Sequence, residues 1–138
     1  MEKNKSRKAK ILVVDDDDGL RGALRIHLES VGYEIDEACD GKDAMEKYQE
    51  SMPDNPYDLI LLDMIMDQVD GVRVIDFIRS EENVRGMMGG KNKPIPIIMV
   101  TALPRGLVNA PEESPDDYIN KPFEIQDLVD KIEKKLKA

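Results

Sequence analysis

The sequence predicts a doubly wound α/β fold with a five-stranded parallel sheet. Short apolar runs that end at a polar residue alternate with amphipathic helical patterns, which is typical of strand–helix–strand units with right-handed crossovers. Residues 11–14 and 59–62 are continuous apolar runs, and such runs indicate strands that are covered by helices on both faces. A chain of 138 residues suits a single domain of this kind.

Glycine and proline mark most of the expected element boundaries. Strands are expected at residues 11–14, 33–38, 59–62, 95–100 and 117–119, and helices at 19–31, 42–51, 72–82 and 125–136. Asp18 is the expected N-cap of the first helix, Gly32 its expected stop, and Asp70 a candidate cap of the third helix. The glycines in 83–94 predict a loop, and three prolines between 104 and 116 argue against a long helix there.

Charge and composition exclude several classes of function. Subtracting the +4 of residues 1–10 and the +3 of residues 131–138 from the net charge of −9 leaves −16 on residues 11–130, which argues against a nucleic-acid-binding surface. No apolar stretch approaches the ~18 residues of a membrane span. A single cysteine, Cys39, and a single histidine, His27, exclude an internal disulfide and a zinc site, and they fit a cytoplasmic location. Cys39 is expected to be buried and His27 to be structural.

Polar side chains follow the predicted strands at the points where the strands end. They are Asp15, Asp16, Asp63, Thr101 and Lys121. In a doubly wound sheet, residues at these points meet in a crevice outside the carboxyl ends of the strands. Three crowded carboxylates repel one another and require a hard divalent cation, and oxygen ligands favour Mg²⁺. Mg²⁺ with a lysine opposite suits a phosphoryl group, for which Asp63 is the candidate nucleophile and Thr101 a candidate hydrogen-bond donor.

The chain resembles the receiver domain of two-component response regulators over residues 9–137. The resemblance rests on Ile-Leu-Val-Val-Asp15-Asp16, Tyr57-Asp-Leu-Ile-Leu-Leu-Asp63-Met, Asp70-Gly71, Ile97-Ile-Met-Val-Thr101-Ala102 and Asp117-Tyr118-Ile-Asn-Lys121-Pro122-Phe123. It implies a flavodoxin-like sheet with strand order 2-1-3-4-5 between two helical layers, here with an irregular fourth helix. Residues 1–8 would then form a basic N-terminal tail and residues 9–138 the receiver domain.

The resemblance also implies roles for the residues of the crevice. Asp63 is the expected phosphoacceptor, and Mg²⁺ is expected to be held by Asp16, Asp63 and the backbone carbonyl of Ile65, with Asp15 acting through water. Four further residues are expected to bind the phosphoryl group or to switch on its arrival: Thr101, Ala102, Lys121 and Tyr118. In that switch the threonine hydroxyl moves to the phosphoryl group and the tyrosine ring turns inward. The Lys121–Pro122 bond is expected to be cis.

The function implied by the resemblance is Mg²⁺-dependent acceptance of a phosphoryl group and switching of a protein-binding surface. The expected donor is a sensor histidine kinase or a phosphotransfer protein, and the expected output is an unidentified protein target. The chain stops after the last predicted helix, so we expect a stand-alone receiver domain, monomeric or weakly dimeric, that binds neither nucleic acid nor membrane. It would catalyse only its own phosphorylation and dephosphorylation.

The sequence departs from the family pattern in the region of the output surface. Asp67 stands four residues after the acceptor, where the family usually has proline, and it adds charge beside the acidic crevice. The stretch before the fourth strand is longer than usual, and the prolines of 104–116 fall where the fourth helix of the family lies.

Two alternative functions fit the sequence less well. A phosphatase of the haloacid dehalogenase type needs an acidic residue two positions after the nucleophile, and that position is Ile65. A pseudo-receiver that only docks partners would lack Asp63 or Lys121, and both are present.

Two apolar residues are expected to flank the path of a hydrolytic water. Ile65 and Leu103 lie two positions after Asp63 and Thr101, and neither side chain can orient a water through a hydrogen bond. We therefore predict slow self-dephosphorylation, and we expect Ile65→Asn to shorten the lifetime of the phosphorylated protein several-fold. The decay of label in purified protein measures this lifetime, and an unchanged rate would contradict the prediction.

Overall fold

A computed structural model describes residues 8–64, 71–89, 94–102 and 116–137 of the protein. Within these ranges, five parallel strands form one sheet in the order β2-β1-β3-β4-β5, as predicted. The strands are β1 (Lys10–Val14), β2 (Glu34–Ala38), β3 (Leu59–Asp63), β4 (Ile97–Thr101) and β5 (Asp117–Asn120). The helices are α2 (Asp18–Val31), α3 (Gly41–Ser51), α4 (Gly71–Met87) and α5 (Ile125–Lys137).

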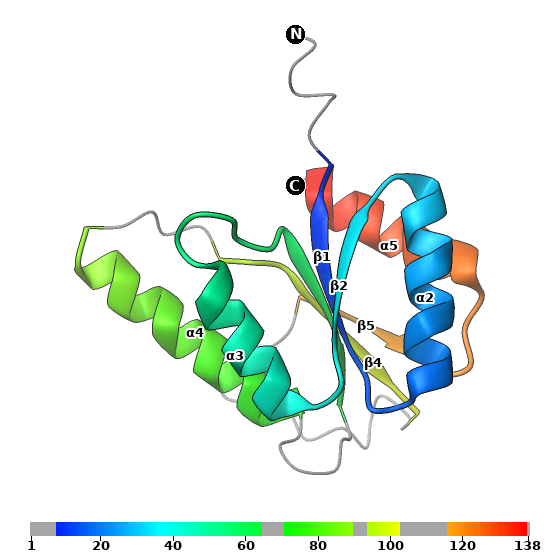
Figure 1. The fold of residues 1–138 in the computed structure, drawn as a ribbon, viewed down its shortest axis with the longest axis horizontal. Helices are drawn as coiled ribbons and strands as arrows, with labels where there is room; N and C mark the ends of the chain where they lie inside the picture. The colour runs from blue at the N-terminus through cyan, green and yellow to red at the C-terminus, as the bar shows by residue number, and fades with distance from the viewer. Residues whose placement is uncertain (1–7, 65–70, 90–93, 103–115, 138) are drawn as a thin grey trace, which may run out of the picture.

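The helices cover the two faces of the sheet in pairs (Figure 1). Helices α2 and α5 lie on one face, and α3 and α4 lie on the other. The core accordingly divides into two clusters, between which the residues of β1 and β3 alternate. Every residue of β1 and of β3 is buried, which confirms that their continuous apolar runs belong to strands covered on both faces.

The first helix is capped one residue earlier than expected. Asp17 has an extended backbone, and its side chain accepts the Leu20 N–H at 3.1 Å, so the N-cap is Asp17 and the prediction of Asp18 is wrong. The prediction of the other end is confirmed, because Gly32 adopts the left-handed conformation (φ 116°) and closes the helix.

Helix α4 runs to Met87, five residues beyond the predicted end at Glu82. The glycine-based prediction is wrong here because Gly86 is accommodated within the helix, and termination comes at Gly89, where φ is +90°. The two buried charged residues of α4 also bond to the segment before β4. Arg79 Nη1 donates to the Ile95 carbonyl at 2.9 Å, and Glu82 accepts the Ile95 N–H at 2.7 Å.

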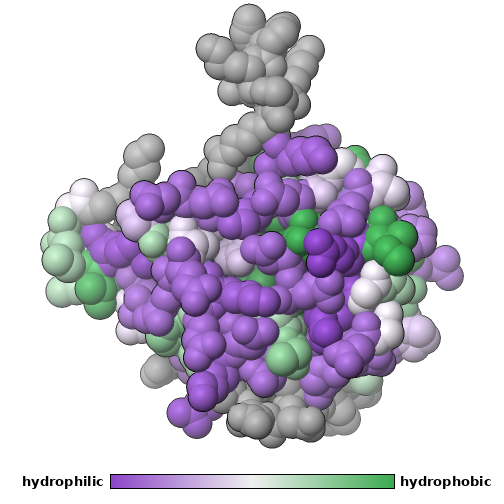
Figure 2. Space-filling view, viewed as in Figure 1, coloured by the Kyte–Doolittle hydropathy of each residue, from purple (hydrophilic) through white to green (hydrophobic). Residues whose placement is uncertain are grey.

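Several other expectations concern the surface or segments outside the described residues. Cys39 is exposed, contrary to the expectation, and His27 is exposed on α2. Outside the described residues lie positions 1–7 of the expected basic tail, the expected cap Asp70, and positions 103–115, which hold most of the region where an irregular helix was expected between β4 and β5. In the face drawn in Figure 2 hydrophilic side chains dominate, as expected for a highly charged chain. Among the helices of the described residues, none combines the length and the apolar character that crossing a membrane requires.

Gly71 brings the start of α4 against the end of β3. Its N–H donates to the Met64 carbonyl at 2.8 Å, and a Cβ at this position would lie 2.7 Å from the Asp63 carbonyl oxygen and 3.0 Å from Met64 Cα. Both are backbone atoms, so the steric overlap of a side chain at this position can be relieved only by moving the helix or the strand.

We predict that Gly71→Ala lowers the free energy of unfolding by about 2 kcal/mol through this overlap. The matched control is Gly22→Ala in α2, where a Cβ meets nothing within 4 Å. We expect the control to be neutral or to stabilise the protein by about 0.5–1 kcal/mol through helix propensity. Urea denaturation measures both changes, and equal effects at the two positions would contradict the prediction.

Candidate functional site

Three carboxylates gather at the carboxyl edge of the sheet. Asp15 follows β1 and Asp63 ends β3, and these strands are neighbours in register, with Val14 opposite Leu62. Asp15 and Asp63 are buried and Asp16 is exposed, and one carboxylate oxygen from each of the three lies within 4.8 Å of the others. The sequence-based expectation that these side chains meet is therefore matched by the geometry.

Lys121 is the cation that contacts this cluster within the described part of the chain. Its Nζ lies 3.1 Å from Asp15 Oδ2 and 3.5 Å from Asp63 Oδ2. Burial alone lowers the pKa of Lys121, but the hydrogen bond to Asp15 and the charge of Asp63 outweigh it and hold the pKa above its usual value. The ammonium is therefore charged at neutral pH. The Lys121–Pro122 bond is cis, as the resemblance implied.

The donor set of this cluster fits Mg²⁺. Among the described contacts, three carboxylates face the ammonium of Lys121, so the cluster is net acidic when all are ionised. All the donors are carboxylate oxygens, which suit a hard cation. One of the three carboxylates is exposed, so the bound cation could keep part of its water. Asp16 and Asp63 remain the candidate direct ligands, and the carbonyl of Ile65 lies outside the described residues.

The remaining predicted site residues occupy the neighbouring strands. Thr101 ends β4 and is buried, and its Oγ1 lies 3.9 Å from Met64 Sδ. Its carbonyl accepts the Lys121 N–H at 2.7 Å, which brings the two residues side by side. Tyr118 is partly buried against the core cluster on the α3–α4 face, and Ala102 is exposed directly after β4. Asp67 and Leu103 are outside the described residues.

One contributor to the site was not predicted from the sequence. Arg21 lies in α2, where its Nη1 donates to the Asp15 carbonyl at 2.7 Å. The position of Arg21 in the sequence is a signal, because a basic residue in the first turn of a helix is unfavourable with the helix dipole unless a specific partner stabilises it. The partner itself, a backbone carbonyl on the preceding turn, leaves no mark in the sequence.

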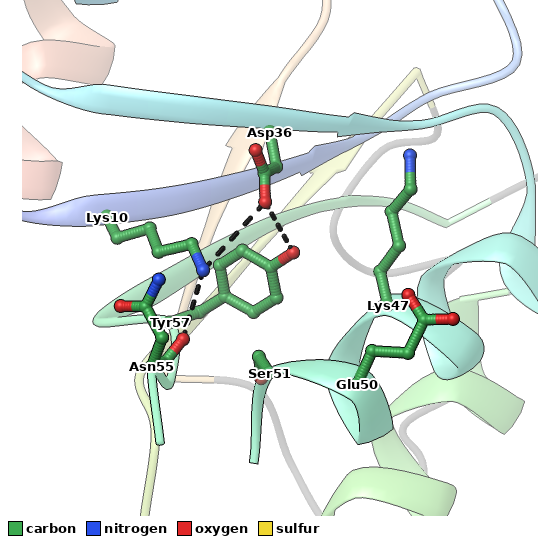
Figure 3. Close-up of a pocket in the computed structure, with 7 residues that line it drawn as sticks. All are labelled: Lys10, Asp36, Lys47, Glu50, Ser51, Asn55 and Tyr57. Carbon is green, nitrogen blue, oxygen red and sulfur yellow. Dashed lines mark hydrogen bonds and ion pairs between the residues drawn. The ribbon is translucent and has the colours of Figure 1, made fainter. Parts of the chain in front are cut away.

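A hollow of about 280 Å³ lies at the amino end of β1, opposite to the end that carries the carboxylate cluster (Figure 3). Lys10 Nζ sits 4.5 Å from the centre of the Tyr57 ring and donates to the Asn55 carbonyl at 3.0 Å. The Tyr57 hydroxyl donates to Asp36 at 2.7 Å, and burial together with this bond raises the pKa of Tyr57. Because these groups satisfy one another, we interpret the hollow as a structural cluster and not as a ligand site.

The chain belongs to the response regulator receiver domain family, whose model matches residues 11–133. This protein is thus a receiver domain of two-component response regulators. Its fold and its carboxyl-edge cluster agree with that assignment.

Similar proteins and structures agree with this family. The transcriptional regulatory protein ResD of Bacillus subtilis is 40% identical over 128 residues, which cover 91% of this chain and 47% of ResD. SrrA of Staphylococcus aureus is 37% identical over 121 residues, covering 86% of this chain and 44% of SrrA. The crystal structure of TrrA from Thermotoga maritima, in complex with Mg²⁺–BeF, is 31% identical with a TM-score of 0.75, covering 92% of this chain and 98% of TrrA. The chain spans about half the length of the curated relatives it matches.

The position of Lys121 makes a prediction about stability. Lys121→Met removes the counter-charge of Asp15 and Asp63, so we expect it to lower the free energy of unfolding in EDTA by about 1 kcal/mol at pH 7. Added Mg²⁺ should stabilise this variant more than the wild type, because the cation replaces the missing positive charge.

Lys131→Met is the matched control for this measurement. Its Nζ lies 3.2 Å from Asp117, at the start of β5 and away from the carboxylate cluster. We expect the control to respond to Mg²⁺ as the wild type does in urea denaturation. The same response in both variants would contradict the interpretation.

Proposed function

We propose that Asp63 accepts a phosphoryl group from a phosphohistidine of a sensor kinase or of a phosphotransfer protein. The observation that carries the proposal is Lys121, whose ammonium bridges Asp15 and Asp63 at the carboxyl edge of the sheet. A lysine held between two carboxylates is poised to offset negative charge on an incoming phosphoryl group.

The proposed chemistry is an in-line transfer to a carboxylate oxygen. An Oδ of Asp63 forms a bond to phosphorus while the bond between phosphorus and the donor nitrogen breaks. The electron pair of that bond stays on the nitrogen, and the imidazole, which carries a proton on its other ring nitrogen, leaves as a neutral ring. Lys121 and the Thr101 hydroxyl are placed to contact the phosphoryl oxygens, the first as a charge and the second as a donor. Asp15, which is buried, accepts a hydrogen bond from the ammonium at 3.1 Å.

Asp16 and Asp63 are the proposed Mg²⁺ ligands, with Asp15 acting through water and the carbonyl of Ile65 as the remaining protein ligand. The cation would supply positive charge for the equatorial oxygens of the phosphoryl group. The Mg²⁺–BeF complex of TrrA supports the choice of Mg²⁺ as the cation.

The output of the domain is proposed to be a change in a protein-binding surface. Phosphorylation replaces the singly charged carboxylate of Asp63 with an acyl phosphate of roughly −1.5 to −2 charge, so the site gains about one negative charge or less. We infer that Thr101 and Tyr118 respond as the switch pair, with Ala102 contributing to the phosphoryl site. The domain would catalyse only its own phosphorylation and dephosphorylation. The net charge of −16 on residues 11–130 argues for a protein target rather than DNA. The cytoplasm is the proposed location.

The proposal is tested by labelling the purified protein with a small acyl phosphate in the presence of Mg²⁺. We predict that Asp63→Ala abolishes the label, whereas Asp130→Ala, which changes an exposed acid on α5, retains it. Removing Mg²⁺ with EDTA should abolish labelling of the wild type as well. Retained labelling of Asp63→Ala at another residue would overturn the assignment.

A further inference from the structure

Arg21 makes three hydrogen bonds around the turn that carries the acidic residues. Its Nη1 donates to the Asp15 carbonyl at 2.7 Å, its Nη2 to Asp18 Oδ1 at 2.6 Å and its Nε to Glu37 Oε1 at 2.8 Å. The side chain is only 13% exposed. All three guanidinium nitrogens are therefore used, one on the turn between β1 and α2, one on the first residue of α2 and one on β2.

Glu37 anchors this guanidinium to β2. Its second carboxylate oxygen accepts from Arg25 Nη1 at 2.9 Å, and the hydrogen bonds from Arg25 and Arg21 lower the pKa of Glu37. The carboxylate is thus ionised at neutral pH and fixed from two sides. Arg25 does not bond to the acidic turn in this arrangement, since its other partner is Glu29 on the same helix.

Hydrogen bonds hold the residues on both sides of Asp16, and Arg21 makes one of them directly. On one side, the Asp15 carbonyl is held by Arg21, and Asp15 Oδ1 accepts the Asp17 N–H at 2.9 Å. On the other side, Asp17 caps α2, and Asp18 is bonded to Arg21. Asp16 is exposed, so its direction depends on the backbone between these anchors.

We propose that Arg21 is a positioning residue for Mg²⁺ binding, which aims the carboxylates of Asp15 and Asp16 by clamping the backbone of their turn. This inference rests on the proposed Mg²⁺ site. The positive charge of Arg21 has the opposite effect on Mg²⁺ affinity, because a cation near the acidic cluster weakens the binding of a second cation. The two effects have opposite signs, so they can be separated by experiment.

The test measures Mg²⁺ affinity of the unphosphorylated full chain by isothermal titration calorimetry. Arg21→Lys keeps the positive charge but cannot span three acceptors, and we expect it to weaken Mg²⁺ binding about tenfold. Arg21→Gln should weaken it at least as much. Arg25→Lys is the matched control, because it lies on the same helix and shares Glu37, and we expect it to bind Mg²⁺ as the wild type does.

A second pair of variants separates positioning from a general loss of stability. Leu24→Ala removes a buried side chain of α2 and lowers stability without touching the turn, and its Mg²⁺ affinity should match that of the wild type. Glu37→Gln loosens the anchor of Arg21 and leaves the turn itself unchanged, so we expect a smaller weakening of about threefold. This variant also serves if the Arg21 variants do not fold.

Three outcomes would overturn the positioning role. They are wild-type affinity in Arg21→Lys, tighter Mg²⁺ binding in Arg21→Gln, and a loss of affinity in Leu24→Ala equal to that in the Arg21 variants. Failure of the proposed function would appear differently, as a wild type that binds no Mg²⁺ or as labelling that survives Asp63→Ala.

Discussion

Repulsion among Asp15, Asp16 and Asp63 is the constraint on which the carboxyl edge of this domain depends. The core imposes their proximity, because β1 and β3 pair in register along two fully buried apolar runs. A slip in that pairing would move core side chains to the wrong face, so hydrophobic burial holds the charged ends together against their repulsion. Lys121 relieves part of that cost, and a divalent cation would relieve more.

The two ends of β1 show how differently charge can be handled in one strand. At its amino end, Lys10, Asp36 and the Tyr57 hydroxyl form a cluster in which each group has a partner (Figure 3). At its carboxyl end, acids outnumber the contacting base. A balanced cluster gains little from a ligand, whereas an unbalanced one gains from any partner that brings positive charge.

Much of this arrangement could be predicted from the sequence, and the misses have physical causes. The buried runs and the polar residues after them identified the sheet and its edge, while the strand order came from the family resemblance. Four consecutive acids offer equal N-cap chemistry, which explains the one-residue error between Asp17 and Asp18. The end of α4 was missed because Gly86 is tolerated inside the helix. The helix is also held by contacts to another segment, such as the bond from Arg79 to the Ile95 carbonyl, which the sequence does not reveal. Arg21 was missed because two of its three partners, the Asp15 carbonyl and Glu37, lie outside its own helix.

The close approach of Gly71 to the Asp63 carbonyl has a mechanical consequence. No space remains for a side chain between the start of α4 and the end of β3, so the two backbones pack directly against each other. If Asp63 is the acceptor, its backbone is supported on the α4 side when a new charge arrives on its side chain. Any displacement must then pass to the opposite flank, toward Thr101 and β5. The missing Cβ of one glycine would thus set the direction in which the domain can yield.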